Sequence, residues 1–196
     1  MRFACVAVPL VAALSLSACG VNSIPTKEEG VKAAWGEVEN QYQRRADLVP
    51  NLVETVKGYA KQEQDVLVGV TEARAKATQT TLKADDLSDP AKVAAYQQAQ
   101  DGLSSALSRL MVVVEKYPEL KSNQNFLALQ SQLEGTENRV SIARRDYNTA
   151  VQSYNTEIRT FPSIIAAKTI YGAKPKEPFK ATAANADTAP KVSFGN

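Results

Sequence analysis

Apolar side chains recur at intervals of three and four residues along most of the chain. An α-helix has 3.6 residues per turn, so this spacing places apolar side chains on one side of a helix and polar ones on the other. The pattern predicts two long amphipathic helices between residues 26 and 80. Their apolar positions are Val31, Trp35, Val38, Tyr42, Val49, Leu52, Val56, Tyr59, Val66, Val70, Ala73 and Ala77.

The boundary between these two helices is expected near Pro50. Proline cannot donate the internal hydrogen bond of a helix and disfavours helix at the residue before it, while Asp47 can cap a following helix. The periodicity continues across Pro50, so a kinked continuous helix is the alternative. A helix unbroken from residue 26 to residue 80 would be about 80 Å long, too long for one compact domain. We therefore expect the chain to reverse direction at Pro50.

Two further helices follow. Residues 78–88 are polar and end the second helix, and Asp89-Pro90 combines a capping residue with a proline suited to the first helical position. Tyr117-Pro118 ends this third helix. Ser122 or Asn123 can cap a fourth helix that ends at Phe161-Pro162 and carries the most regular pattern: Phe126, Leu129, Leu133, Thr136, Val140, Ala143, Tyr147, Val151, Tyr154 and Ile158.

These patterns predict an all-α fold. Four amphipathic helices with short connections bury their apolar sides most completely as an antiparallel up-and-down four-helix bundle with long helices. We expect the bundle over residues 26–171, including a short final helix after residue 163. Glycines inside the predicted helices each cost up to about 1 kcal/mol relative to alanine, and we expect them to permit close helix–helix approach. They are Gly58, Gly69, Gly102 and Gly135.

The N-terminus has the layout of a bacterial export signal. A short positive start, Met1-Arg2, precedes an apolar run, and Leu16-Ser17-Ala18-Cys19-Gly20 resembles a lipobox. Residues 1–18 are then a signal peptide, Cys19 is the lipidated first mature residue, and residues 19–25 link it to the bundle. The alternative is an uncleaved transmembrane helix near the lower limit of roughly 17–25 residues. Either anchor tethers the bundle to a membrane on its non-cytoplasmic side, which is periplasmic in a Gram-negative cell.

The last part of the chain differs in composition. Residues 172–196 contain Pro175, Pro178 and Pro190 among small and polar residues, which predicts an extended, flexible C-terminal tail. Val192-Ser193-Phe194 is the one apolar group in its final portion. This group can dock on the bundle or on a partner.

Composition restricts the chemistry. The 196 residues include no histidine, and Lys plus Arg exceeds Asp plus Glu by only 23 to 21. The small net charge argues against nucleic-acid binding, and the missing histidine removes the commonest general base and metal ligand. There is no glycine-rich phosphate loop. We expect no metal, no cofactor and no enzymatic activity, although a Ser-Lys pair stays open because its members need only meet in space.

Two polar groups are candidates for an interaction surface. The first, Arg44, Arg45 and Asp47, lies beside Pro50; the alternative is that the arginines bond carbonyl groups at a helix end. The second is Glu137-Asn138-Arg139. Its alternative is pairing within the helix or fixing of the register between helices.

Five motifs together resemble the bacterial LemA family. They are residues 41–53 (Gln-Tyr-Gln-Arg-Arg-Ala-Asp-Leu-Val-Pro-Asn-Leu-Val), 117–121 (Tyr-Pro-Glu-Leu-Lys) running into Asn125-Phe126, 133–139 (Leu-Glu-Gly-Thr-Glu-Asn-Arg), 143–148 (Ala-Arg-Arg-Asp-Tyr-Asn) and 161–163 (Phe-Pro-Ser). The resemblance covers about residues 24–194. It implies a four-helix bundle attached to a membrane by its N-terminus, with no established biochemical activity and no agreed catalytic site. A lipobox in place of a plain transmembrane helix departs from the commonest family layout.

Two classes of function fit these expectations. The first is a non-catalytic interaction or scaffold module at the bacterial cell envelope, bound to the membrane through lipidated Cys19 and to an unknown envelope protein. The second is an unrecognised envelope hydrolase or small-ligand binder. The second predicts a pocket of a few hundred cubic ångströms with convergent polar groups and shifted pKa values.

Overall fold

The computed structural model describes residues 21–180, and the described residues form helices and connecting segments without a strand. This confirms the predicted all-α class. The predicted signal peptide, Cys19 and Val192-Ser193-Phe194 lie outside the described residues. The four long helices are α2 (Ser23–Tyr59), α3 (Gln64–Gln79), α4 (Pro90–Val114) and α6 (Gln124–Glu157). The short elements are η1 (Ala84–Ser88), α5 (Pro118–Lys121), α7 (Ser163–Ala166) and η2 (Ala167–Tyr171).

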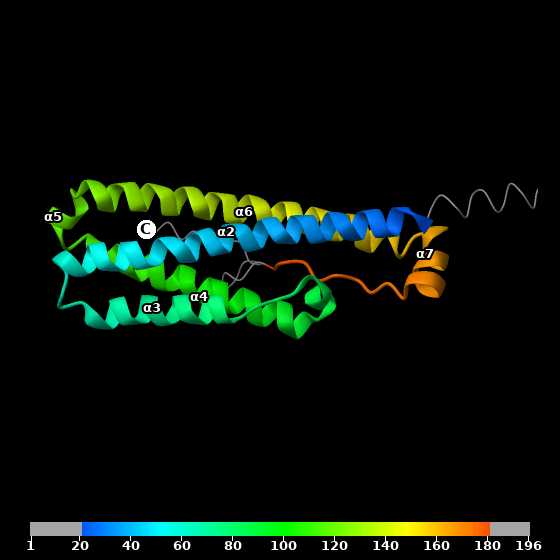
Figure 1. Ribbon diagram of the computed structural model, residues 1–196, viewed down its shortest axis with the longest axis horizontal. Coiled ribbons are helices and arrows are strands. Elements are labelled where there is room, and N and C mark those ends of the chain that lie inside the picture. The colour runs from blue at the N-terminus through cyan, green and yellow to red at the C-terminus, as the bar shows by residue number, and fades with distance from the viewer. Residues whose placement is uncertain (1–20, 181–196) are drawn as a thin grey trace, which may run out of the picture.

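Successive long helices run in opposite directions along one elongated body (Figure 1). α2 packs along α6 and against α3, and α3 packs against α4. α2 and α6 extend beyond α3 toward the end of the molecule that carries α7 (Figure 1). Among residues 21–180, no helix has both the length and the apolar content needed to cross a membrane.

The expected reversal at Pro50 is wrong, because α2 continues through Pro50 to Tyr59 and the chain turns at residues 60–63 instead. Proline at position 50 leaves the carbonyl of Ala46, four residues earlier, without its helical donor. Arg74 of α3 replaces that donor: its Nε lies 2.8 Å from the Ala46 oxygen. The neighbouring helix therefore compensates for the proline, and α2 stays helical.

The predicted caps of α4 and α6 are confirmed. The Asp89 carboxylate accepts hydrogen bonds from the amides of Ala91 and Lys92 at 3.0 and 3.3 Å, with Pro90 in the first helical position. The Asn123 side chain accepts from the amide of Phe126 at 3.0 Å. Each side chain satisfies amides that the first turn of a helix leaves unpaired.

The core consists of two clusters. The cluster between α2, α3, α4 and the first half of α6 is mainly aliphatic, with Leu52, Leu103 and Leu110 fully buried and Phe126 as its one buried aromatic residue. The cluster near α7 is aromatic: the ring of Trp35 lies 5.2 Å from that of Tyr96 and 5.7 Å from that of Tyr147. The aromatic cluster lies where α2 and α6 extend past α3, so other segments must cover it.

The C-terminal segment, defined as residues 173–180, supplies part of that cover. It is extended, as predicted, but its Phe179 is buried in the aromatic cluster. The expectation of a flexible tail from residue 172 is therefore corrected for the residues up to 180. The apolar sides of α2 and α6 need a covering layer here, and the segment provides it with hydrogen-bonded main chain.

The helical glycines do not mark close helix–helix contacts, contrary to our expectation. A Cβ atom placed on Gly58, Gly69 or Gly102 would meet nothing within 4 Å. At Gly135 it would meet only the Arg139 side chain at 3.8 Å. Interhelical packing does not require glycine at any of the four positions.

Candidate functional site

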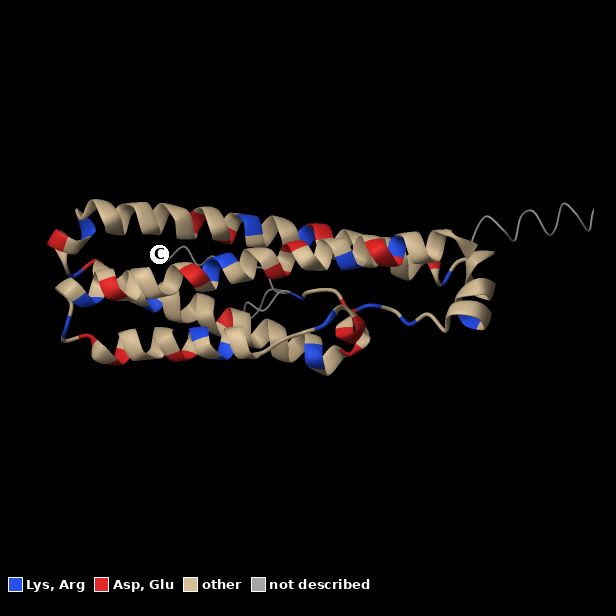
Figure 2. Cartoon of the chain, in the orientation of Figure 1, with Lys and Arg blue, Asp and Glu red and all other residues tan. Residues whose placement is uncertain are grey.

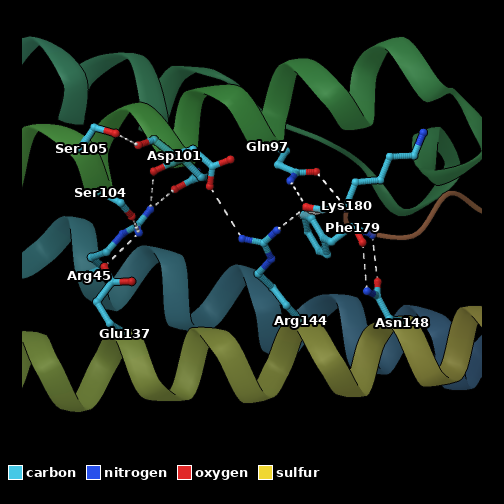
Figure 3. A network of polar contacts seen from close by, with 11 residues as sticks. Arg45, Gln97, Asp101, Ser104, Ser105, Glu137, Arg144, Asn148, Phe179 and Lys180 are labelled. Carbon is cyan, nitrogen blue, oxygen red and sulfur yellow. Dashed lines mark hydrogen bonds and ion pairs between the residues drawn. The ribbon is translucent and has the colours of Figure 1, made fainter. Parts of the chain in front are cut away.

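The most distinctive polar feature of the described chain is a groove between α4 and α6. One half of this groove holds the C-terminal segment, and Figure 3 shows Gln97 of α4 together with Arg144 and Asn148 of α6 directed at its main chain. The segment runs antiparallel to α6, because Lys176 bonds Asn155 whereas Phe179 bonds Asn148.

Three side-chain amides each bond both main-chain groups of one residue in the segment. Asn155 donates to the Lys176 carbonyl and accepts from its amide, both at 2.8 Å. Asn148 does the same for Phe179, at 3.0 and 2.8 Å. Gln97 donates to the Lys180 carbonyl and accepts from its amide. An amide group offers one acceptor and two donors, so it matches a peptide group as a neighbouring strand would.

The spacing of these amides matches an extended chain. Asn148 and Asn155 are seven residues apart, a rise of about 10.5 Å along an α-helix. Lys176 and Phe179 are three residues apart, a rise of about 10 Å in an extended strand. Between them, the Glu177 amide donates to the Leu87 carbonyl at 2.8 Å, and the Tyr147 hydroxyl donates to the Glu177 carbonyl at 2.9 Å. The groove therefore binds main chain in a defined register.

Side chains of the segment add further contacts. The Phe179 ring lies 5.3 Å from the Tyr147 ring, and the Arg144 guanidinium lies over the Phe179 ring at 4.8 Å. Lys176 forms an ion pair with Glu28 at 3.1 Å. Burial raises the pKa of Tyr147 above its ordinary value and raises the pKa of Tyr154 to about 12.

Beyond Lys180, the same two helices line a cavity of about 540 Å³, which we call the second half of the groove. An ion pair between Arg144 of α6 and Asp101 of α4, 3.7 Å apart, crosses the groove between the two halves. On α4 the cavity begins at Ser104, after Gln97, and on α6 it begins at Asn138, before Arg144. It therefore lies beyond Lys180 along the direction of the C-terminal segment. The apolar lining is Leu107, Met111 and Leu133, and the polar lining is Ser104, Ser108, Gln130, Glu134, Glu137 and Asn138.

Arg45 lies at the junction of the two halves of the groove (Figure 3). Its guanidinium donates to the Ser104 hydroxyl at 2.6 Å and to the Glu137 carboxylate at 3.0 Å. It also donates to the main-chain and side-chain oxygens of Gln100 at 3.0 and 2.8 Å. Arg45 is only 1% exposed, so the expectation that it belongs to an interaction surface is corrected: it ties α2 to α4 and α6.

The other five predicted surface residues lie in three places. Glu137 and Asn138 line the groove. Arg44 and Asp47 are exposed on α2, and Asp47 accepts from the Gln43 amide at 2.8 Å. Arg139 is exposed and directed at Gln41 of α2, 3.3 Å away. The structure therefore joins the two predicted groups through the Arg45–Glu137 ion pair and leaves Arg44, Asp47 and Arg139 apart from it.

Sequence reasoning missed Gln97, Asn148 and Asn155. Two features of the sequence could have indicated the asparagines. They are seven residues apart, and each directly follows a tyrosine on the apolar side of the fourth helix, Tyr147 or Tyr154. These features identify a stripe of amides beside the core, but they do not name what the amides bind.

A second, smaller cavity of about 200 Å³ lies among α2, α3 and α4. Its lining includes Glu39, Tyr42, Thr80 and Gln100. The Tyr42 hydroxyl is buried without a hydrogen-bond partner, and burial raises the pKa of both Tyr42 and Glu39. Within residues 21–180, no group of three or more potential side-chain ligands is arranged to hold a metal ion.

Sequence comparison assigns the family. The sequence model of the LemA family matches residues 34–194, which is most of the chain and includes the C-terminal segment. The chain belongs to the LemA family. The match also covers the groove residues on α4 and α6, so the groove belongs to the part of the chain that the family model describes.

Several curated proteins are similar to this LemA family chain. Magnetosome protein MamQ 2 of Paramagnetospirillum magneticum is 29% identical over 157 residues, covering 72% of this chain and 58% of that protein. Magnetosome protein MamQ of Magnetospirillum gryphiswaldense is 26% identical over 169 residues, covering 78% and 62%. Protein LemA of Metamycoplasma hominis is 21% identical over 140 residues, covering 71% and 60%. The chain spans about three fifths of the length of these relatives.

Proposed function

We propose that this chain is a membrane-tethered, non-catalytic interaction module of the bacterial cell envelope, and that its α4–α6 groove takes up an extended segment of another envelope protein. The observation that carries the proposal is the set of paired amide contacts in the first half of the groove. They support it because each pairs a side-chain amide with the main chain of the protein's own extended segment. The second half is a cavity lined by the same two helices, on the far side of the Arg144–Asp101 ion pair.

The lining of the second half defines the kind of segment it fits. Leu107, Met111 and Leu133 favour apolar side chains. Glu137 already neutralises Arg45, which leaves Glu134 to attract a basic side chain. The ligand is therefore an extended peptide that carries apolar residues and one lysine or arginine.

The tether is supported by the lipobox-like sequence ending in Cys19. The relatives named as magnetosome proteins also favour a family that works at bacterial membranes. A tethered module needs no catalytic group, which fits a chain without histidine.

Photo-cross-linking in intact cells tests the groove. A photoreactive phenylalanine replaces Ser108, which lines the groove, or Ser105, which does not. Both serines are exposed on α4, and each bonds the carbonyl four residues earlier, at 3.0 and 2.9 Å. We expect the probe at position 108 to cross-link to a second envelope protein and the probe at position 105 to give no such product.

The cross-link must also depend on the groove. Filling it with Glu134→Trp in the same strain should abolish the product, whereas Ile142→Trp, at another exposed position of α6 that does not line the groove, should leave it intact. A product confined to this chain would assign the groove to its own residues 181–196 and overturn the proposal. Equal cross-linking from positions 105 and 108 would overturn it as well.

A small-ligand binder is the second candidate, because the cavity at Tyr42 has a buried hydroxyl without a partner. A ligand with a hydrogen-bond acceptor there would satisfy this group. Native mass spectrometry of the purified protein, compared with Tyr42→Phe, is the test. A copurified small molecule lost in the variant would favour this candidate, and two identical ligand-free spectra would remove it.

A further inference from the structure

The end of the molecule that carries α7 exposes an unusual set of apolar side chains. Phe161 is 81% exposed, Ile165 57%, Ile170 62% and Tyr171 41%. All four lie within the thirteen residues 159–171, and we call them the α7 patch. The other large exposed apolar residues of the described chain are spread over four helices: Tyr59, Val68, Val112, Leu127 and Ile142. Apolar groups concentrated on one end need a partner that covers them.

The α7 patch lies beside the point where the chain enters the bundle. The Tyr171 hydroxyl donates to the carbonyl of Val21 at 3.0 Å. Glu157, at the end of α6, accepts from Ser163 and Ser23 and pairs with Lys27. These contacts join the start of α2, the end of α6 and α7 into one unit, at the right-hand end of the body in Figure 1.

Cys19 is only two residues before Val21. Two residues span at most about 7 Å even when fully extended. Whether Cys19 carries lipid or the preceding residues form a membrane helix, the anchor therefore lies close to the α7 patch. The surface nearest to this end of the bundle is the membrane itself.

The charges of this segment fit the same surface. Residues 159–171 contain two cations, Arg159 and Lys168, and no acidic residue, and both cations are exposed. Figure 2 shows the neighbouring acidic groups of η1 on the lower side of the body. Asp85 and Asp86 line a cavity there that Tyr171 of the patch also borders, together with Lys174 and Lys176. Exposed aromatic and aliphatic residues flanked by cations are typical of a segment that lies in the lipid headgroup region.

We propose that the α7 patch is a membrane-contact surface, with Phe161 and Ile165 entering the headgroup region of the bilayer. The bundle then stands end-on against the membrane, and the α4–α6 groove extends away from the lipid. The inference rests on the membrane tether of the proposed function, but it does not depend on what the groove binds.

Site-specific fluorescence in vesicles tests the contact. The full chain, processed and lipidated, is reconstituted in vesicles of phosphatidylethanolamine and phosphatidylglycerol. A bimane label is attached through Ile165→Cys or, as the matched control, Val112→Cys, which is 68% exposed on α4. Both positions are exposed β-branched residues in helices, so the fold tolerates either change. Lipids brominated near the headgroup quench only labels that reach the bilayer.

We expect quenching at position 165 to exceed quenching at position 112 several-fold, with both proteins retained on the vesicles. Equal quenching at the two positions, with retention intact, would overturn the contact while leaving the tether standing. Loss of both proteins from the vesicles would overturn the tether and the contact together. Cross-linking from position 108 reports on the groove separately.

Discussion

Pro50 illustrates how one residue depends on another far away in sequence. Because Pro50 has no amide hydrogen, the carbonyl of Ala46 receives no hydrogen bond from its own helix. Arg74 of α3 donates to that carbonyl instead. A buried carbonyl left without a donor costs about 1–3 kcal/mol. The proline and the arginine are therefore expected to contribute to stability as a pair.

A double-mutant cycle measures this coupling. Arg74→Ala should lower the free energy of unfolding by about 1–3 kcal/mol in the native background. In a Pro50→Ala background the helix supplies its own donor to Ala46, so the same change should cost clearly less. Urea denaturation of the four proteins checks this, and strictly additive effects would show that Arg74 does not compensate for Pro50.

At the level of helices, features set by neighbouring residues could be predicted from the sequence. Features that depend on residues of another helix could not. Asp89 and Asn123 cap the helices that follow them directly, and both caps were predictable from neighbouring residues. The turn at residues 60–63 contains neither glycine nor proline, so nothing in its own sequence identifies it. The continuity of α2 depends on Arg74, which sequence periodicity cannot place.

In the candidate site as well, residues whose role depends on other helices could not be predicted from the sequence. Glu137 and Asn138 were predictable as exposed polar residues of the fourth helix, and they line the groove. Arg45 looked like a surface residue because its partners, Gln100, Ser104 and Glu137, come from two other helices. The docked C-terminal segment depends in the same way on Asn148 and Asn155.

The C-terminal segment behaves as an element of the core, which leads to a prediction for Phe179. Phe179→Ala should destabilise the protein by about 3–5 kcal/mol, because it removes a buried aromatic ring. Phe161→Ala, at an exposed phenylalanine, is the control and should change stability by no more than about 0.5 kcal/mol. Thermal unfolding of both variants checks this, and equal melting temperatures would remove the segment from the core.

Glu157 links the ends of α2 and α6 to α7 and should make this junction sensitive to acid. Hydrogen bonds from Ser163 and Ser23, with the charge of Lys27, hold the pKa of Glu157 below its ordinary value of 4.5. A carboxyl with a lowered pKa in the folded state stabilises the fold above its unfolded pKa and loses this effect as pH falls through the folded value.

Glu157→Gln should therefore destabilise the protein most near neutral pH. The difference from the native chain should persist down to about pH 4.5 and shrink as the pH falls further. Urea unfolding at a series of pH values gives the measurement. A difference that stays constant into the acid range would show that the carboxylate charge is not what stabilises the junction.

The whole molecule is an elongated bundle, and the proposed anchor at Cys19 lies at its α7 end. Cys19→Ala should block lipidation and processing, because the thiol that is acylated is lost. Mass spectrometry of the mature N-terminus and membrane fractionation check this. An unchanged mature mass together with unchanged membrane partition would contradict the lipobox interpretation and favour the transmembrane alternative.

The central claim is that the groove between α4 and α6 binds extended main chain. Amide hydrogen exchange of residues 176, 177, 179 and 180 tests it most directly, because the amide of each donates a hydrogen bond within the bundle. We predict that these four amides exchange as slowly as amides in the buried part of α6. Exchange at the rate of an unstructured peptide would contradict the account.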